Sequence, residues 1–364
     1  MKDIVEALSA WQRDQVRFAV ATVVATWGSA PRPSGAAMAV SETGEVVGSV
    51  SGGCVEGALY EVATEVLRSG ESRLVRYGVS DDDAFSVGLT CGGTLDVLVV
   101  PVDGRTYPEF GEVAAAVMAG EAVAVATVTG GMPEIGRRIV VTRTGTTGTL
   151  GHVRCDATVA ELARGMLGSG RTGLVSTGVR DRRFGDDLRV FVQSFTPPPR
   201  MLVFGAIDFA GAVARIGKFL GYHVTVCDAR PVFATRNRFP EADEVVVDWP
   251  HRFLPTVEVD ERTAICVLTH DPKFDVPLLK VAVQTSAGYI GVMGSRRTHD
   301  DRMARLRTEN VSEAQLRRLS SPIGLDLGAR TPEETAVSVA AEIIALNWGG
   351  TGSRLSTTTT AIHR

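Results

Sequence analysis

The chain has 364 residues, of which 44% are hydrophobic and 22% are charged, and its formal net charge is −4. This length allows two or three domains with substantial cores, and the lack of a basic excess argues against a nucleic-acid-binding surface. Five cysteines are too few for a disulfide framework in a chain of this length, so we expect reduced thiols in a cytoplasmic compartment.

The first part of the chain predicts short strands joined by turns and helices. The polar start, MKDIVEALSAWQRDQ, has no signal-peptide pattern, and no apolar run reaches the roughly 18 residues of a membrane span. Periodicity and turn residues predict, in chain order, a helix within 1–17, a strand at 18–27, a hairpin at 36–50, a helix from Val55 that Gly70 closes, and a strand at 94–101.

An internal repeat with an offset near 100 residues runs through this part. AVATV begins at residue 19 and again at residue 124, and EVATEVLRSG is echoed about 100 residues later by ELARGMLGSG. Because the offset is much longer than a solenoid repeat, we infer two related half-domains, near 18–101 and 122–195. Together they predict an α+β N-terminal domain with an internal duplication over residues 1–195.

Residues 196–200, TPPPR, predict a stiff proline linker that leads to a second domain at 201–350. Strands and helices alternate beyond it, which indicates a Rossmann-like, doubly wound parallel sheet. The expected strands are 201–204, 223–228, 244–247, 263–269 and 289–293, and the expected helices are 209–220, 275–286, two that start near Arg296 and Ser312, and 332–346. The Ser/Thr-rich tail, 351–364, predicts disorder.

Two cysteines lie beside paired glycines, and only in the first copy of the repeat. The residues in these two motifs, SGGC and CGG, are Gly52, Gly53, Cys54, Cys91, Gly92 and Gly93. Cys54 immediately precedes a predicted helix, whose free N–H groups favour a thiolate and bind anions. The corresponding stretches of the second copy read GHVRCDAT and RRFGDDL. We interpret the two thiols as candidates for binding a thiophilic metal or carrying sulfur; the alternative is two buried cysteines beside tight turns.

The remaining cysteines and two charged residues near the first motif have simpler interpretations. Cys155, Cys227 and Cys266 are predicted to lie in the core. Glu56 either caps its helix or acts as an acid or base beside the thiol. Arg32, in SAPRPSG, either meets a phosphate or is an ordinary loop arginine.

A dinucleotide-binding fingerprint occurs in altered form in the second domain. GAIDFAG follows its first strand from Gly205, and Asp228 ends the second strand, where a ribose-binding acid belongs. Ile207 replaces the glycine that lets a pyrophosphate approach the backbone. NAD(P) binding in the usual pose is therefore disfavoured, and a scaffold or another phosphate-bearing ligand is favoured.

Polar residues also follow the next strand. LTHDPKFD places His270, Asp271 and Asp275 at the carboxyl end of a buried strand, where doubly wound sheets bind ligands. They form either an acid/base or metal constellation or a turn with a helix cap.

After the following strand, Gly294, Ser295, Arg296 and Arg297 open a helix. Backbone N–H groups and arginines suit a phosphate, and paired arginines on a solvated helix are the alternative. The glycine-rich PIGLDLGARTPEE predicts a loop along the same edge.

These motifs in this order resemble the XdhC/CoxI family of xanthine dehydrogenase accessory proteins. The resemblance rests on SGGCVEG, GLTCGGTLDV, FGAIDFAG, LTHD, YIGVMGSRR and PIGLDLGARTPEE, and it extends from about residue 14 to 346. It implies a cytoplasmic, dimeric chaperone without turnover of its own that binds the molybdenum cofactor (molybdopterin). Such a protein supports sulfuration of the cofactor by a cysteine desulfurase and its insertion into an apo molybdenum hydroxylase of the xanthine or CO dehydrogenase type.

By position, the resemblance makes Cys54 and Cys91 the thiols that contact the molybdenum of the cofactor. It makes residues 205–210 a Rossmann loop in which relatives carry a glycine instead of Ile207, and it leaves Ser295 and Arg296 near a pterin phosphate. The alternative is an NAD(P)-dependent oxidoreductase with a cysteine redox pair. The chain is too short, and lacks the cysteine runs, to be a molybdenum hydroxylase itself.

Overall fold

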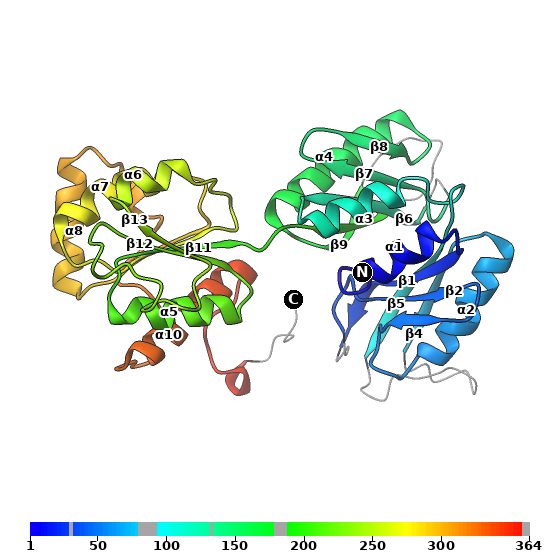
Figure 1. Ribbon diagram of the computed structural model, residues 1–364, viewed down its shortest axis with the longest axis horizontal. Coiled ribbons are helices and arrows are strands. Elements are labelled where there is room, and N and C mark those ends of the chain that lie inside the picture. Colours follow the sequence, from blue (N-terminus) through cyan, green and yellow to red (C-terminus); the bar gives the residue numbers. More distant parts are fainter. Residues whose placement is uncertain (29–31, 79–92, 132–133, 178–187, 359–364) are drawn as a thin grey trace. The chain divides into compact units, whose positions relative to one another are not determined.

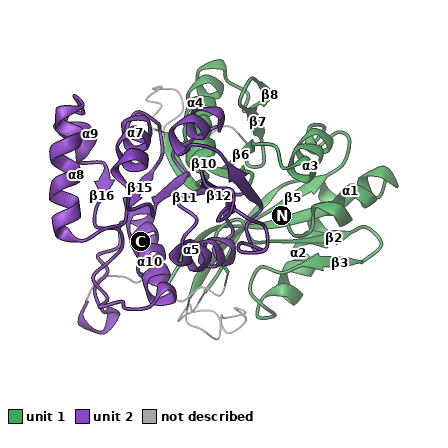
Figure 2. Cartoon of the chain, turned by 60° about the vertical axis from the view of Figure 1, so that its left-hand side comes forward, with its two compact units in different colours: residues 1–197 green, residues 198–364 purple. Residues whose placement is uncertain are grey.

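The computed structural model describes residues 1–28, 32–78, 93–131, 134–177 and 188–358. The chain divides into two compact units, residues 1–197 and 198–364, shown in green and purple in Figure 2. No described helix is both long and apolar enough to span a membrane.

Unit 1 contains two five-stranded antiparallel sheets with the same strand order, β3-β2-β1-β5-β4 and β8-β7-β6-β10-β9 (Figure 1). The strands are β1 (Phe18–Trp27), β2 (Ala37–Ser41), β3 (Val46–Gly48), β4 (Arg73–Tyr77), β5 (Thr94–Val102), β6 (Val123–Gly130), β7 (Arg138–Thr142), β8 (Thr146–Thr149), β9 (Gly173–Thr177) and β10 (Leu188–Phe195). The helices are α1 (Val5–Arg13), α2 (Glu56–Ser69), α3 (Phe110–Ala119) and α4 (Val153–Ser169).

The two sheets of unit 1 pack face to face, and each is covered on its outer face by its own helix. In β1, Val20 faces the core between the sheets, whereas its neighbours Ala19 and Ala21 face the core under α2. In β6, Val125 likewise faces the inner core and Ala124 the core under α4. Because both faces are buried, these strands read as nearly continuous apolar runs. The layers are therefore α2, sheet, sheet and α4, and apolar residues of α1 and α3 join the core between the sheets.

Unit 2 is a six-stranded, all-parallel sheet with the order β13-β12-β11-β14-β15-β16. Its strands are β11 (Arg200–Phe204), β12 (His223–Asp228), β13 (Glu244–Val247), β14 (Ala264–Val267), β15 (Tyr289–Val292) and β16 (Leu319–Ser320). Its helices are α5 (Asp208–Phe219), α6 (Pro250–Phe253), α7 (Pro272–Ala282), α8 (Arg296–Thr308), α9 (Glu313–Leu316) and α10 (Pro332–Trp348), with short 3-10 helices η1 (Leu254–Thr256) and η2 (Leu355–Thr357).

Helices cover both faces of this sheet, which confirms the predicted Rossmann-like fold. Apolar residues of α5 and α10 pack on one face, and those of α7 and α8 pack on the other. The antiparallel sheets and helices of unit 1 confirm the predicted α+β fold of the N-terminal domain. The predicted start of α10 is also confirmed, because Thr331 and Glu334 form a capping box.

The elements predicted for unit 2 differ from the structure in two respects. The helix expected at 275–286 is α7, which begins earlier because Asp271 caps it, accepting a hydrogen bond from the Lys273 amide at 3.0 Å. Strand β16 and helix α6 are not anticipated, since two and four residues are too few for a periodic pattern. In the tail, the short helix η2 spans three residues, residues 359–364 lie outside the described chain, and disorder over 351–364 stays a prediction.

Candidate functional site

The loop that precedes α2 presents Cys54 beside an open backbone surface. Cys54 is half-buried and lies directly before Val55, the N-cap residue of the helix. Gly52 and Gly53 have φ values of +77° and +116°, which side-chain-bearing residues rarely adopt. A Cβ atom added to either glycine would meet no atom within 4 Å. The glycines are therefore required by the backbone conformation, and the space in front of them is open.

The carboxylate of Glu56 holds this loop in place through hydrogen bonds. It accepts hydrogen bonds from the amides of Val50 (3.2 Å), Ser51 (2.9 Å), Gly52 (3.1 Å), Gly53 (2.9 Å) and Val55 (3.2 Å), and from the hydroxyls of Ser49 (2.7 Å) and Ser51 (2.5 Å). Partial burial opposes ionisation of Glu56, but these hydrogen bonds outweigh it and lower its pKa to about 2.

These contacts change two expectations from the sequence. The amides of Gly52, Gly53 and the N-cap residue Val55, which lie beside Cys54, donate to the Glu56 carboxylate and are therefore not available to an anion or a thiolate. Of the two interpretations of Glu56, the structure supports the local structural one, because a carboxyl group with a pKa near 2 is not a proton donor at neutral pH. Glu56 fixes the loop on which Cys54 stands.

In the second copy of the repeat, a carboxylate also holds the loop before the helix, through fewer hydrogen bonds. Asp156 accepts hydrogen bonds from the hydroxyl of Thr149 and the amide of Leu150, both at 2.7 Å. This match places Arg154, which is exposed, in the position of Cys54. Cys155, the cysteine of this second-copy stretch, corresponds to the buried Val55 and is itself buried, which confirms its predicted place in the core.

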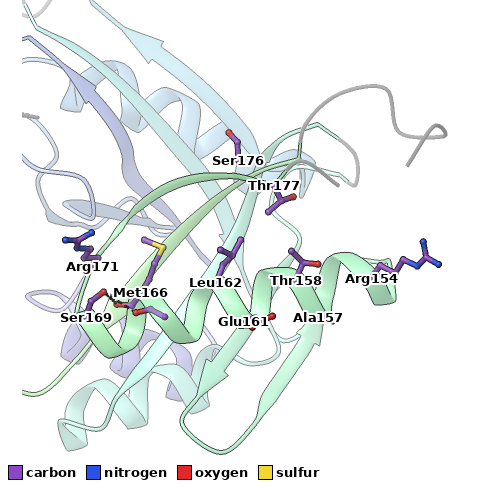
Figure 3. Close-up of a pocket in the computed structure, with 11 residues that line it drawn as sticks. Arg154, Ala157, Thr158, Glu161, Leu162, Met166, Ser169, Arg171, Ser176 and Thr177 are labelled. Carbon is purple, nitrogen blue, oxygen red and sulfur yellow. Dashed lines mark hydrogen bonds between the residues drawn. The ribbon is translucent and has the colours of Figure 1, made fainter. Parts of the chain in front are cut away.

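A surface groove of about 1050 Å³ runs along α4 beside β9 in this second copy. Figure 3 shows Arg154 near one end of the helix and Arg171 near the other, with Leu162 and Thr158 between them. No predicted site residue of the described chain lines this groove. Arg154, at one end of the groove, places a guanidinium where the first copy has the thiol of Cys54.

The remaining cysteines fall into two groups. Cys91 and Gly92 lie outside the described residues, and Gly93 is buried directly before β5. Joint action of Cys54 and Cys91 therefore stays a prediction. The expectation that Cys227 and Cys266 lie in the core is confirmed, and burial raises the pKa of both thiols to about 12.

In unit 2, the loop after β11 contacts the loop after β14, at the point where the strand order reverses. Gly205 has φ +107°, and a Cβ there would lie 2.9 Å from the amide of Thr269. Ile207 is half-buried at the N-cap of α5, and Asp208, which follows it, is 89% exposed. A pyrophosphate at this helix start would meet a branched side chain and a carboxylate.

Asp228 stabilises the same loop through a hydrogen bond. It is buried and accepts a hydrogen bond from the Ala206 amide at 2.8 Å, and Arg230 pairs with both of its oxygens at 2.9 and 2.8 Å. Burial opposes ionisation, but the hydrogen bonds from Arg230 and Ala206 outweigh it and lower the pKa of Asp228. Both oxygens expected to meet a ribose therefore already accept hydrogen bonds within the protein.

The acids of the LTHD segment do not form one cluster. Asp271 caps α7 and pairs with Lys273 at 3.0 Å, and His270 is exposed. Asp275 is buried and pairs at 2.9 Å with the buried Arg302, while the hydroxyl of Thr269 donates to it. The turn-and-cap interpretation fits Asp271. Desolvation by burial raises the pKa of Asp275.

Arg302 is a residue that the sequence analysis missed. Its guanidinium also donates to the Met293 carbonyl at 2.9 Å, so the ion pair joins α7 and α8 to the end of β15. The local signal for its burial is its place next to Met303, since Met303 and Leu306 are the buried apolar residues of α8.

The start of α8 faces solvent at the carboxyl edge of the sheet. The hydroxyl of Ser295 accepts a hydrogen bond from the Thr298 amide at 3.2 Å, and Ser295, Arg296 and Arg297 are exposed. Gly294 precedes the cap, and phosphate binding by this segment stays a prediction. In unit 1, Arg32 pairs with Asp3 at 3.5 Å, and phosphate binding by Arg32 stays a prediction.

Two family models match the chain. One, for the XdhC Rossmann domain, matches residues 201–343, and the other, for the XdhC and CoxI family, matches residues 11–78 and 116–178. The two matches cover both units.

Similar proteins include two named bacterial relatives and a solved structure. A protein of Bacillus subtilis, named as a probable xanthine dehydrogenase subunit, is 29% identical over 339 residues, which cover 93% of this chain and 95% of the relative. The molybdenum cofactor insertion chaperone PaoD of Escherichia coli is 27% identical over 322 residues, covering 88% of this chain and 81% of the relative. A crystal structure described as a xanthine dehydrogenase from Bacillus halodurans matches with a TM-score of 0.65 and 26% identity over 98% of each chain.

Proposed function

Because the chain belongs to the XdhC and CoxI family, we propose that it is a maturation factor for a molybdenum hydroxylase of the xanthine dehydrogenase or CO dehydrogenase type. It binds the molybdenum cofactor as cargo and delivers it to the apo-enzyme. The supporting observation is the alignment, over 88% of this chain, with a protein named as a molybdenum cofactor insertion chaperone.

Cys54 is the residue of the described chain that best suits contact with the cargo. Its thiol is half-buried on a loop that Glu56 holds, and the space in front of Gly52 and Gly53 is open. Molybdenum with sulfur ligands is thiophilic, so a presented cysteine suits it. In this proposal Cys91, beside Gly92 and Gly93, supplies the second thiol.

The finer steps of the proposal concern sulfur, the phosphate of the pterin and assembly. A cysteine desulfurase supplies the sulfur while the cofactor is bound, and the protein acts as a homodimer. In unit 2, Ser295 and Arg296 hold the phosphate at the exposed start of α8, close to Gly294 and on the sheet edge that also carries Gly205 and His270. Asp228 contributes by shaping the Gly205 loop.

Cofactor retention tests this function. The protein is purified from cells that make molybdopterin, and released pterin is measured by fluorescence. Wild type is expected to carry pterin, and Cys54→Ser and Cys91→Ser are expected to lose most of it. Arg154→Ser is the matched control, because Arg154 occupies the position of Cys54 in the second copy, and it is expected to retain pterin. A wild-type protein that carries none would overturn the proposal.

A further inference from the structure

A small cavity of about 40 Å³ lies between the two sheets of unit 1. Equivalent residues of the two repeat copies line it, such as Val20 with Val125 and Thr22 with Thr127. The cavity therefore lies where the two copies of the duplication meet.

Arg138 breaks the symmetry of this cavity. Ala37 pairs with Thr22 in the first sheet, and Arg138 pairs with Thr127 in the second, so Ala37 and Arg138 are structural counterparts. The first copy thus places a methyl group where the second places a guanidinium. Arg138 is only 7% exposed.

The guanidinium of Arg138 is incompletely satisfied by the protein. Its Nε and Nη2 atoms both donate to the carbonyl of Gly136, at 3.0 and 2.9 Å, and its central carbon lies 3.8 Å from the centre of the Tyr107 ring. Within the described chain, neither Nη1 of Arg138 nor the hydroxyl of Tyr107 has a hydrogen-bond partner, although both are buried. The guanidinium stacks on the ring face and interacts with the Tyr107 hydroxyl, but the hydroxyl is neutral and supplies no counter-charge.

The charge of Arg138 is also poorly balanced. Glu109 is the acid that influences the pKa of Arg138, but the two do not form an ion pair among the described residues, and burial lowers the pKa of the guanidinium. Arginine nevertheless stays protonated in proteins, and a buried charge without a counter-charge is costly. A water molecule would accept from Nη1 but would not neutralise the charge, whereas an anion does both.

We propose that this cavity binds one small monovalent anion of the halide class, held by Nη1 of Arg138 and the hydroxyl of Tyr107. The hydroxyls of Thr22 and Thr127 and the side-chain amide of Gln193, which also donates to the Gly35 carbonyl at 3.1 Å, are further donors in its lining. The cavity volume admits a particle of this size, since a single water needs about 10–15 Å³. The anion would neutralise the buried charge that Arg138 adds to the core between the two sheets.

Bromide crystallography and halide-dependent melting test this proposal. Crystals of the wild-type protein in sodium bromide are expected to show an anomalous peak beside Nη1 of Arg138. In solution, the melting temperature is expected to be higher in sodium chloride than in sodium gluconate at equal ionic strength, because gluconate is too large for the cavity.

Two variants and a control make the test specific. Arg138→Ala, which copies Ala37, and Arg138→Met, which keeps more of the volume, are expected to lose the peak and the chloride dependence. Arg137→Ala removes the neighbouring half-exposed arginine and is expected to keep both. If a variant fails to fold, the wild-type bromide peak still decides the question. A wild-type cavity without an anomalous peak, or chloride dependence that persists in Arg138→Met, would overturn the proposal.

Discussion

Glu56 and Asp156 hold equivalent loops in the two copies of unit 1, since each carboxylate accepts hydrogen bonds from residues six and seven positions before it. Glu56, which is one methylene longer, also binds the amides of Gly52 and Gly53. The shared contacts belong to the duplicated scaffold, and the additional ones coincide with the Gly-Gly-Cys sequence of the first copy. The scaffold therefore became a fixed support for Cys54 in one copy only.

Glu56→Gln is expected to destabilise the protein by about 1–3 kcal/mol, because an amide cannot replace a charged acceptor of several backbone N–H groups. Asp156→Asn, the matched change in the second copy, is expected to have a smaller effect, since within the described chain Asp156 accepts the two hydrogen bonds given above and Glu56 accepts seven. Urea unfolding of both variants measures this difference, and equal effects would contradict it.

The stability that Glu56 provides is expected to depend on pH in the acid range. Its folded-state pKa of about 2 lies below the value of about 4.3 in an unfolded chain, so the contribution is complete above about pH 4.3 and is lost as the pH falls toward 2. Urea unfolding across this range is expected to show a steeper loss of stability in wild type than in Glu56→Gln. Parallel curves for the two proteins would show that Glu56 does not titrate in this way.

Gly53→Ala is expected to destabilise the Cys54 loop by about 1–3 kcal/mol, because alanine rarely adopts the φ of +116° found there. Gly57→Ala is the control, since Gly57 lies within α2 in ordinary helical conformation with open space around it. That change is expected to stabilise the protein by about 0.4–1 kcal/mol. Thermal unfolding distinguishes the two, and a neutral Gly53→Ala would show that the loop adopts another conformation.

Asp275→Ala is expected to destabilise unit 2 by about 3–5 kcal/mol, because it leaves the buried Arg302 without its carboxylate partner. The double variant Asp275→Leu with Arg302→Met is expected to recover much of this loss, since it removes both buried charges. Denaturant unfolding measures the stability of the single and the double variant. A double variant as unstable as Asp275→Ala would indicate that packing rather than charge determines stability here.

NAD⁺ and NADP⁺ are expected to leave the melting temperature of the wild-type protein unchanged. Ile207 and Asp208 stand at the helix start where a pyrophosphate would bind, and Arg230 pairs with the acid that would bind ribose. Ile207→Gly alone is expected to remain unresponsive, because Asp208 and the Asp228–Arg230 pair persist. A thermal shift in the wild type would instead favour the dinucleotide-dependent oxidoreductase.

Local patterns in the amino-acid sequence were enough to predict most elements and the fold class. Alternating strands and helices predict the parallel sheet of unit 2, and the capping box of Thr331 and Glu334 joins residues only three positions apart. The duplication is visible because short motifs recur at a nearly constant offset. That offset is not uniform, however, and the strand register was needed to pair Ala37 with Arg138.

The roles of the charged side chains, in contrast, became apparent from the three-dimensional structure. Asp275 and Arg302 are 27 positions apart, and Asp228 and Ala206 are 22 apart, so the periodicity of neighbouring residues does not predict either contact. The same kind of carboxylate titrates differently according to the donors that folding brings to it and the water that folding removes. Hydrogen bonds in the folded state lower the pKa of Glu56, and burial raises the pKa of Asp275. The free energy of a charged group depends on all of its surroundings.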